Sequence, residues 1–318
     1  WIPLLLGLLA LLWGRGTIKN TPGQIFERES AYNYIQVLEV DGFRYLRLNE
    51  GQGVHSVYHP WQLQYNGPWM QVLAAPFFNP APYAPEQVRS MAIVGLAAGT
   101  TARQATAVFG DIPIDGFEID PAIIQVGEQF FGMNLPNLRP IPQDGRWGLE
   151  HSPRRYSIIS VDAYRPPYIP WHLTTRQFFQ SVYEHLEADG VLVINVGRAP
   201  NDRRLIEGLA ATIGTVFPSL YVMDVPDTFN SILYATRQPT QVENFYANYQ
   251  ALQMRADVHP LLLAAVTRAV ASLHANPCAG DHPAAGCVVF TDDRAPIEWI
   301  TNDMVLRYVL AGGVEDLQ

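Results

Sequence analysis

The chain has 318 residues, of which 48% are apolar and 16% charged, and its formal net charge is -9. This composition is typical of a globular protein with one sizeable α/β domain and smaller additions. The acidic balance argues against a protein that follows nucleic-acid phosphates, because such proteins usually present a basic face. We therefore expect no nucleic-acid partner.

An apolar segment runs from Trp1 to Trp13, and Arg15, Lys19 and Arg28 follow it. As a helix it would span ~20 Å, less than the ~30 Å hydrocarbon core of a bilayer. Interfacial tryptophans and a basic cytoplasmic flank are typical of membrane helices. We interpret the segment as the end of a transmembrane helix that starts upstream, with the soluble domain in the cytoplasm. A signal-peptide remnant is the alternative, but it lacks a preceding basic region and a clear cleavage site.

Two strand-like runs follow, at residues 32–40 and 43–48. Asp41-Gly42 lies between them, which is a strong hairpin signal because a type I′ turn needs positive φ at both central residues. Residues 49–66 continue in irregular or short-strand form. These runs predict a small N-terminal β unit.

Strand-like and helix-like segments alternate after a proline-rich break at residues 76–85. This alternation predicts an α/β fold with a mostly parallel sheet that helices cover on both faces. The expected strands are 91–94, 114–119, 138–142, 156–161 and 191–196, with an edge hairpin at 221–225 and 231–236. The expected helices are 101–109, 122–131, 175–186, 202–217, 258–273 and one within 290–310. The predicted division is the end of a transmembrane helix (1–13), a linker (14–26), the β unit (27–75), the α/β domain (86–240) and a C-terminal helical extension (241–318).

The two cysteines, Cys278 and Cys287, lie in one Pro- and Gly-rich stretch with His274 and His282. Two Cys and two His this close together allow a tetrahedral zinc site. Most spacings of this kind match no zinc pattern, so a surface loop with incidental thiols is the simpler interpretation, and we expect no metal. A local disulfide is the third interpretation, and it requires an oxidising compartment.

A glycine-containing turn, Gly95 to Gly99, follows the first strand of the alternating region. Glycine here lets a ligand approach the backbone at the sheet edge, although a packing turn would need it equally. Glu118 ends the next strand, near the ~20-residue spacing at which an acid accepts ribose hydroxyls, whereas Asp120 fits a helix N-terminus better. Because the Gly-x-Gly-x-x-Gly pattern is absent, we expect a Rossmann-like domain that binds an adenosyl nucleoside rather than a dinucleotide.

Two further carboxylates follow the third and fourth strands. Asp144, which precedes Gly145, can accept a hydrogen bond from an adenine amino group. Asp162 follows a hydrophobic strand and precedes Tyr164. A carboxylate at the ligand-facing edge is partly desolvated, which would raise its pKa and makes it a candidate functional group. An exposed turn aspartate is the alternative.

In order and spacing, these pieces resemble the polyamine aminopropyltransferase (spermidine synthase) family. The resemblance covers roughly residues 27–240. It is carried by Glu29-Ser-Ala-Tyr-Asn-Tyr-Ile-Gln36-Val, Tyr58-His59, Gly95 to Gly99, Glu118-Ile-Asp, Asp144-Gly145 and Val161-Asp162-Ala-Tyr164. In detail the chain is most similar to bacterial membrane-fused spermidine-synthase-like proteins, in which transmembrane helices precede this domain. The resemblance implies a Rossmann-like, class I methyltransferase-type fold.

The resemblance also implies a co-substrate and roles for particular residues. The donor would be decarboxylated S-adenosylmethionine, held by Gln36, Gly95, Gly99, Glu118, Asp144 and Gly145. Asp162 matches the family's catalytic aspartate, which would take a proton from the attacking amine. The acceptor side would be lined by Tyr58, His59, Tyr164 and Arg165.

The chain departs from the family pattern on the acceptor side. Ala98 stands where the glycine loop usually carries an Asp, Arg165 replaces the second acid of the fourth-strand motif, and His55 lies in a stretch where an acid is expected. A cationic Arg165 would repel the far ammonium of a diamine. Arg165 and His172 suit an anionic or neutral acceptor better, so we expect an altered acceptor.

Three functions follow from this pattern. The first is aminopropyl transfer to an altered amine or other small-molecule acceptor. The second is a methyltransferase that uses S-adenosylmethionine. The third is a non-catalytic accessory subunit of a membrane complex that retains the fold. A homo-oligomer, or association with membrane-complex subunits, is expected.

Overall fold

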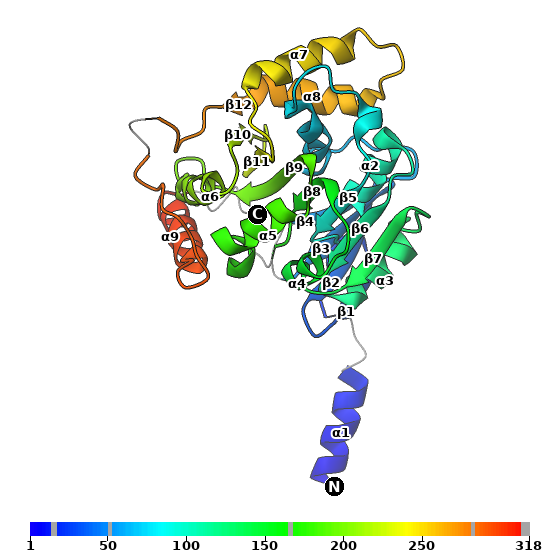
Figure 1. Ribbon diagram of the computed structural model, residues 1–318. Helices are drawn as coiled ribbons and strands as arrows, with labels where there is room; N and C mark the ends of the chain where they lie inside the picture. Colours follow the sequence, from blue (N-terminus) through cyan, green and yellow to red (C-terminus); the bar gives the residue numbers. More distant parts are fainter. Residues whose placement is uncertain (14–17, 50–52, 165–167, 281–283, 313–318) are drawn as a thin grey trace.

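A mostly parallel sheet of eight strands forms the centre of the protein (Figure 1). The computed structural model describes residues 1–13, 18–49, 53–164, 168–280 and 284–312, and all strands discussed lie in these ranges. The strand order is β12-β10-β11-β9-β8-β5-β6-β7. Strands β5 to β9 run parallel, and β10, β11 and β12 pair antiparallel at one edge. The strands are β5 (Met91–Val94), β6 (Ile114–Glu118), β7 (Leu138–Pro142), β8 (Tyr156–Val161), β9 (Leu186–Gly197), β10 (Ser219–Asp224), β11 (Asn230–Thr236) and β12 (Leu273–His274).

Helices cover both faces of this sheet, as the alternating pattern predicts. They are α2 (Thr100–Phe109), α3 (Pro121–Phe130), α4 (Gly145–Glu150), α5 (Arg176–Glu184), α6 (Arg204–Gly214), α7 (Val242–Gln253), α8 (Pro260–Ser272) and α9 (Ile297–Leu310), with short 3₁₀ helices at Trp69–Phe78, Pro85–Gln87 and Trp171–Leu173. Successive residues of β5 point to opposite faces. Met91 and Ile93 join the core with α2, α7 and α8, whereas Ala92 and Val94 join the core with α4, α5 and α6. Burial on both faces explains why β5 is a continuous apolar run.

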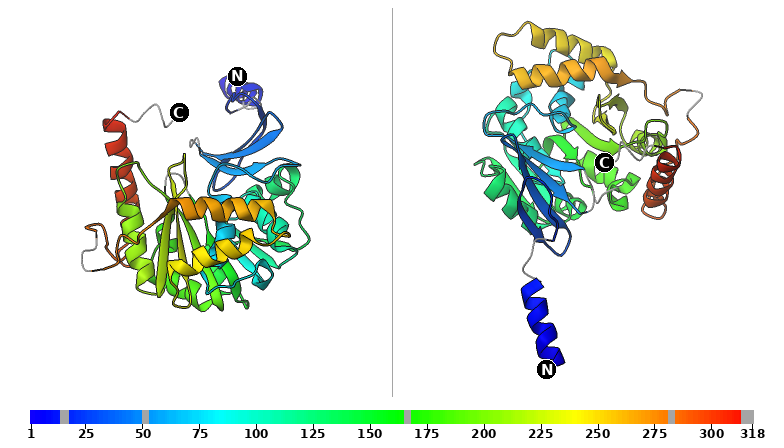
Figure 2. Two further views of the ribbon diagram at one scale, coloured as in Figure 1. Left: turned by 90° about the horizontal axis from the view of Figure 1, so that it is seen from above. Right: turned by 180° about the vertical axis from the view of Figure 1, so that it is seen from behind.

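Four antiparallel strands form a second, N-terminal sheet in the order β1-β2-β3-β4 (Figure 2). They are β1 (Gln24–Glu29), β2 (Tyr34–Val40), β3 (Phe43–Leu48) and β4 (Val54–Tyr58). The predicted hairpin is confirmed, because Asp41 and Gly42 join β2 to β3 with φ of 53° and 81°. Strand β1 was not expected and begins inside the predicted linker. It is ordered by its pairing with β2, a contact that local sequence does not specify.

The N-terminal sheet is hydrogen-bonded to the first turn of the main domain. The Ser56 Oγ accepts a bond from the Ala98 amide at 3.0 Å. The Thr100 Oγ1 accepts from the Val57 amide at 2.9 Å and donates to the Val57 carbonyl at the same distance. These bonds place β4 over the end of β5, so the second sheet supplies side chains to the sheet edge where ligands bind in such folds.

The C-terminal extension is part of the main core. Leu261, Leu262 and Val266 of α8 are buried in one cluster with the 3₁₀ helix Trp69–Phe78, all of whose residues are buried. The prediction of a core or interface helix at 258–273 is therefore confirmed as a core helix. The polar Asn248 of α7 is also buried, and its amide donates to the carbonyls of Phe77 and Asn79 at 2.8 Å.

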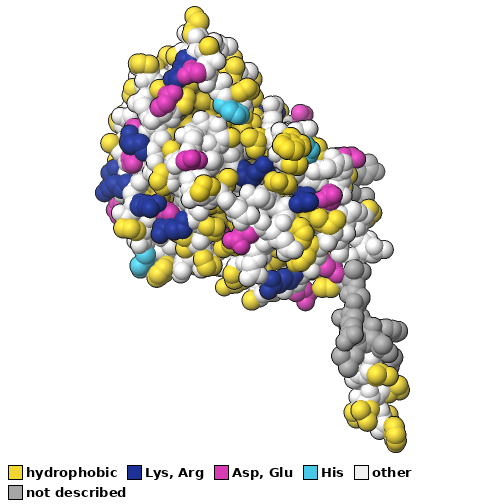
Figure 3. Space-filling model, turned by 90° about the vertical axis from the view of Figure 1, so that its right-hand side faces the viewer, with side chains coloured by type: hydrophobic (Ala, Val, Ile, Leu, Met, Phe, Trp, Pro, Cys, Tyr) yellow, Lys and Arg dark blue, Asp and Glu magenta, His cyan; other side chains and the backbone are white. Residues whose placement is uncertain are grey.

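The first helix, α1 (Ile2–Trp13), has 12 residues, and the side chains of Trp1, Leu4 and Leu6 are exposed. Figure 3 shows hydrophobic side chains at this end of the chain, away from the rest of the molecule. Within the described ranges, none of the helices has the length and apolar character that crossing a membrane requires. The structure therefore gives no support to the predicted transmembrane segment.

Cys278 and Cys287 form a disulfide. This corrects the simpler interpretation of a loop with incidental free thiols. In the part of the chain that the structure describes, no group of three or more His, Cys, Asp or Glu side chains could hold a metal ion. His282, which belonged to the possible zinc set, lies outside the described residues.

Candidate active site

Two adjoining cavities lie at the carboxyl ends of β5, β6, β7 and β8. The first has a volume of about 380 Å³ and the second about 290 Å³. Their walls share His55, Gly95, Ala97, Asp162 and Tyr164. In the sheet, β5 lies between β6 and β8, so the strand order reverses at β5. Ligands of open α/β sheets bind at such a reversal. The fold thus places two connected binding spaces at its expected ligand site.

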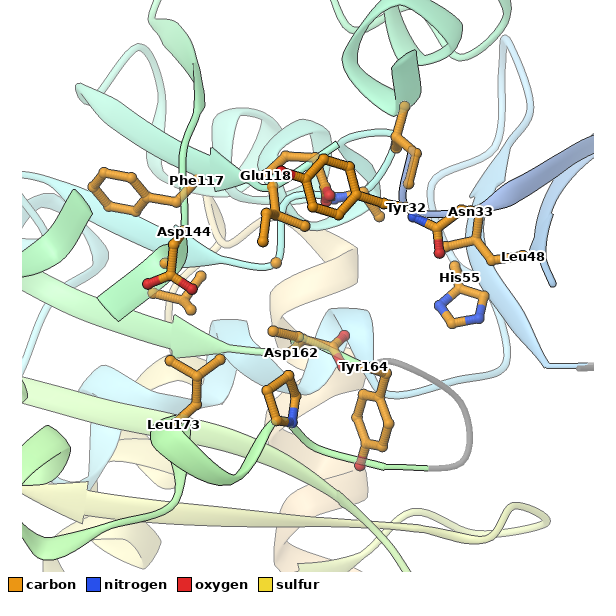
Figure 4. A pocket seen from close by; sticks show the side chains of 18 of the residues that line it. Tyr32, Asn33, Leu48, His55, Phe117, Glu118, Asp144, Asp162, Tyr164 and Leu173 are labelled. Atoms are coloured by element: carbon orange, nitrogen blue, oxygen red, sulfur yellow. The ribbon is translucent and has the colours of Figure 1, made fainter. Parts of the chain in front are cut away.

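Glu118 is the last residue of β6 and lies in the wall of the first cavity (Figure 4). Its Oε2 accepts a hydrogen bond from the Ala97 amide at 2.9 Å, and its Oε1 accepts one from the Asp120 amide at 3.1 Å. Burial raises the pKa of Glu118 to about 7 despite these bonds. Each carboxylate oxygen has a further lone pair, so the group can accept hydrogen bonds from a ligand.

Asp144 lies across the first cavity and begins helix α4 (Figure 4). Its Oδ1 accepts from the Trp147 amide at 3.0 Å, and its Oδ2 lies 2.9 Å from His172 Nε2. The hydrogen bond with His172 lowers the pKa of the Asp144 carboxyl. Gly145 follows, and a side chain there would collide with Val94, so the close packing of α4 on β5 requires glycine. The site therefore holds a second, ionised carboxylate.

Asp162 directly follows β8 and lies in the wall of both cavities. Its Oδ1 accepts a hydrogen bond from the Asn195 side-chain amide at 2.8 Å. Oδ2 has no hydrogen-bond partner among the described residues. Burial raises the pKa of Asp162 to about 6, and the Asn195 bond opposes this rise. At neutral pH the group is mostly ionised and can accept a proton.

Tyr164 holds the segment after β8 against β9. Its hydroxyl donates to the Asn195 carbonyl at 3.1 Å and accepts from the Gly197 amide at 2.6 Å. Burial and the nearby Asp162 charge raise the pKa of Tyr164, so the phenol stays protonated. The ring is therefore a fixed, neutral part of both cavity walls.

Gly95 follows β5 and lines both cavities. Its φ is 89°, and a Cβ there would lie 2.6 Å from the Asp162 carbonyl oxygen. Glycine is required both by this conformation and by the close approach of the β5 and β8 turns. Gly99 also has positive φ, 82°, but lies in neither cavity wall. A Cβ at Gly99 would collide with Met133, so its observed role is packing at the start of α2.

Comparison with known proteins gives both sequence relatives and structural neighbours. A probable polyamine aminopropyl transferase of Bifidobacterium longum is 31% identical over 286 residues, which cover 86% of this chain and 61% of that protein. The polyamine aminopropyltransferase of Vibrio vulnificus is 29% identical over 245 residues, covering 73% of this chain and 76% of that protein. The crystal structure of a spermidine synthase in complex with the transition state analogue AdoDATO has a TM-score of 0.61 and 17% identity, covering 77% of this chain and 84% of that one.

Sequence and fold together support the polyamine aminopropyltransferase (spermidine synthase) family. The structural likeness on its own shows the fold. The chain spans 61% of the length of the Bifidobacterium longum relative.

A mouse eEF1A lysine and N-terminal methyltransferase is 27% identical over 165 residues, covering 48% of this chain and 23% of that protein. No protein-family model matched the chain. The membrane-fused subgroup expected from the sequence has no support in these relatives.

Gln36, like Gly99, was predicted from the family resemblance to hold the donor but lies outside both cavity walls. Gln36 is in the middle of β2, and its amide donates to Thr21 Oγ1 at 3.0 Å and to Gln24 Oε1 at 2.6 Å. It lies in neither cavity wall, whereas Asn33, just before β2, lines the first cavity. The residue of this segment that lines the first cavity is therefore three positions earlier than expected.

Two of the predicted acceptor residues also lie outside both cavity walls. The guanidinium of Arg103 packs over the Tyr58 ring, with Arg103 Cζ 4.3 Å from the ring centroid. The His59 ring packs on Phe43 at 4.6 Å, and its Nδ1 accepts from backbone amides of the following turn. These side chains are occupied by structural contacts. From the same strand, His55 lines both cavities instead.

Arg165 lies outside the described residues, so its predicted contact with the acceptor stays a prediction.

Asp120 is the N-cap of α3, as expected, and accepts from the Ala122 amide at 3.0 Å. It has a further role that was not expected. Its Oδ2 also accepts from Ser30 Oγ at 2.5 Å and from Asn33 Nδ2 at 3.0 Å, and so fixes the loop that carries Asn33.

Proposed function

We propose that the chain transfers an aminopropyl group from decarboxylated S-adenosylmethionine to a primary amine. The observation that carries this proposal is the position of Asp162, which lies in the wall shared by two cavities. A transfer reaction needs a donor site and an acceptor site that meet at the reacting atoms. The relatives described above support this class of reaction.

The first cavity suits the nucleoside of the donor. Glu118 at the end of β6 offers paired oxygens for two ribose hydroxyls, which is the role of the acid at this place in nucleotide-binding α/β folds. Asp144 offers an acceptor for an exocyclic amino group on the far wall. Tyr32 and Asn33 cover the same cavity from the N-terminal sheet (Figure 4). The donor propyl carbon would then lie toward Asp162.

The second cavity holds the acceptor amine. The amine nitrogen attacks the propyl carbon bound to the sulfonium sulfur, forming a C–N bond. The C–S bond breaks, and its electron pair stays on sulfur, which leaves as the neutral thioether 5′-methylthioadenosine. The nitrogen gives up one proton to the Asp162 carboxylate, which is available because its pKa of about 6 keeps it mostly ionised at neutral pH.

Equilibrium binding of nucleosides to the purified chain tests the donor half of this proposal. We expect calorimetry to give measurable affinity for decarboxylated S-adenosylmethionine and for 5′-methylthioadenosine, and weak affinity for adenosine 5′-monophosphate, because phosphate would lie near carboxylates. Incubation with the decarboxylated donor and a panel of amines should then release 5′-methylthioadenosine. A chain that binds neither nucleoside would contradict the proposal.

Methyl transfer from S-adenosylmethionine is the second candidate, favoured by the mouse methyltransferase relative. S-adenosylmethionine carries a carboxylate that the decarboxylated donor lacks, and a site for it would need a cationic or amide partner. The same calorimetric experiment separates the two candidates. Aminopropyl transfer predicts tighter binding of the decarboxylated compound, and methyl transfer predicts the reverse.

The location of the chain is a separate proposal. The basic residues after the apolar N-terminal segment favour a membrane-anchored protein with its soluble domain in the cytoplasm. The disulfide between Cys278 and Cys287 instead favours an oxidising compartment. Digestion of intact cells with an added protease decides between the two, because only a domain outside the cytoplasm would be cleaved before the cells are lysed.

A further inference from the structure

The wall of the second cavity contains polar atoms without partners. His55 Nε2 and Asn195 Oδ1 are both buried and have no hydrogen-bond partner in the described chain. Both residues line this cavity. Buried polar atoms in folded proteins are nearly always hydrogen-bonded, and each exception needs an explanation. A ligand in the cavity would supply the missing bonds.

Asn195 lies where the attacking amine nitrogen of an acceptor would bind, beside Asp162. Its amide nitrogen donates to Asp162 Oδ1, which fixes the orientation of the side chain. The free Asn195 Oδ1 therefore lies beside the Asp162 carboxylate and, like it, can accept an N–H. An amine nitrogen between these two groups would find two acceptors, one charged and one neutral.

His55 approaches from the opposite side. It lies on β4, in the N-terminal sheet, and lines both cavities. Figure 4, a view of the first cavity, shows its ring on the side opposite Asp162 and Tyr164. Burial lowers the pKa of His55 to about 4, so the imidazole is neutral at physiological pH. A neutral imidazole offers one donor and one acceptor, and it suits an uncharged polar group.

The charge of this wall limits what the far end of an acceptor can be. Among the described residues that line the second cavity, Asp162 is the only carboxylate. The other side chains of this wall that could contact the far end of an acceptor are neutral, including those of Trp69, Thr101 and Asn230. Among these described residues a second ammonium would find no carboxylate besides Asp162, so it would lose its hydration without gaining an ionic partner from them, which is costly. A hydroxyl or amide would lose less and would satisfy His55.

We propose that the second cavity selects a primary amine whose far end carries an uncharged hydrogen-bonding group, a hydroxyl or an amide, and that His55 Nε2 binds this far end. The proposal rests on the proposed aminopropyl transfer and names its acceptor class. It makes His55 a specificity-determining residue, contributed by strand β4 of the N-terminal sheet, which also supplies Val54 and Ser56 to this cavity.

Three amines of matched length test this selectivity: 4-aminobutan-1-ol, 1,4-diaminobutane and butylamine. Their binding is measured by calorimetry on the full chain saturated with 5′-methylthioadenosine, so that no turnover is needed. We expect the amino alcohol to bind at least about tenfold more tightly than either of the others, which corresponds to ~1.4 kcal/mol. Equal or tighter binding of the diamine, or no binding of any of the three, would overturn the proposal.

Variants at His55 make the test specific. In His55→Ala the amino alcohol should lose its advantage over butylamine, whereas butylamine affinity should change by less than about threefold. In His55→Glu a carboxylate enters the cavity, and the preference should shift toward the diamine. His151→Ala is the control, because this exposed histidine stacks on Trp147 outside both cavity walls. An unchanged order of affinities in both His55 variants, with thermal unfolding like that of the parent, would contradict the role of His55.

The nucleoside step separates the two proposals. If 5′-methylthioadenosine does not bind the parent chain, the proposed function fails and the acceptor proposal falls with it. If the nucleoside binds and the diamine is preferred, aminopropyl transfer stands and the selectivity proposal alone is wrong.

Discussion

The side-chain amide of Asn195 donates a hydrogen bond to Asp162 Oδ1 at 2.8 Å. Asn195 belongs to β9 and Asp162 follows β8, so the bond joins the ends of two neighbouring parallel strands. It gives the carboxylate one fixed orientation and opposes the rise in pKa that burial causes. Asn195, on the neighbouring strand, thus orients the carboxylate of Asp162, the proposed base, and favours its ionised form.

Removing this bond should shift the pH dependence of transfer. In Asn195→Ala the pKa of Asp162 should rise above its value of about 6, because burial remains and the opposing hydrogen bond is lost. Activity that needs ionised Asp162 should then appear at higher pH than in the parent. The measurement is kcat/KM against pH with a saturating amine. An acidic limb at the same pH in both proteins would show that Asn195 does not tune Asp162.

Glu118 should control nucleoside affinity. Its pKa of about 7 means that the carboxylate is protonated below this value and ionised above it, and the ionised form accepts ribose hydroxyls more strongly. Affinity for 5′-methylthioadenosine should therefore rise as pH increases through about 7. Glu118→Gln should weaken binding by about 1.5–3 kcal/mol at pH 8 and should remove the pH dependence. Calorimetry at pH 6 and 8 checks both effects, and equal affinities in the two proteins would exclude Glu118 from the site.

The residues at the strand ends could be predicted from sequence because a simple rule locates them. Parallel strands that are buried on both faces read as apolar runs, and a polar residue just after such a run lies at the ligand edge. Asp162 follows a strand of this kind, β8, and Glu118 ends β6, which is also fully buried. Asp144 comes after β7, an edge strand that is only partly buried, so the rule applies to it less well. The structure brings all three carboxylates to one cavity. The same rule applies to Gly95, whose conformation matches the expected turn.

The contribution of the N-terminal sheet could not be predicted in the same way. The pairing of β3 with β4 shifts register between Leu46 and Arg47, and such an irregularity changes which side chains of the strand face the cavity. His55 therefore lines the cavities, and Tyr58 and His59 do not. Asn33 depends on Asp120, 87 positions away in the chain, and no local pattern reports that contact.

Asp120 should link stability to nucleoside binding. It caps α3 and also accepts bonds from Ser30 and Asn33, so Asp120→Ala removes a cap and releases the loop over the first cavity. We expect a loss of about 2–4 kcal/mol in the free energy of unfolding, the sum of a typical cap and hydrogen bonds to a charged group. Urea unfolding measures this loss.

Nucleoside affinity should fall in the same variant, because the loop carrying Asn33 lines the nucleoside cavity. Asp111→Ala is the matched control, since Asp111 is an exposed residue near the opposite ends of these strands. If Asp120→Ala behaves like the control in both measurements, the hydrogen bonds of Asp120 do not hold the N-terminal loop.

The disulfide should protect both thiols in the isolated protein. Without reductant, iodoacetamide should add nothing to Cys278 or Cys287, and after reduction it should add to both, as intact mass would report. The bond closes a short loop with a sequence separation of 9. Its removal in a double Cys→Ser variant should lower stability by no more than about 3 kcal/mol. Alkylation of the unreduced protein would contradict the pairing.

Release of 5′-methylthioadenosine by the parent chain and by Asp162→Asn tests the central claim most directly. Both proteins are incubated with decarboxylated S-adenosylmethionine and with whichever of 4-aminobutan-1-ol, 1,4-diaminobutane and butylamine gives the fastest release from the parent, and calorimetry establishes that both bind the nucleoside. We expect the variant to bind it nearly as well as the parent but to release product about 10²- to 10⁴-fold more slowly, the usual contribution of a general base. Equal rates of release from the two proteins would contradict the account.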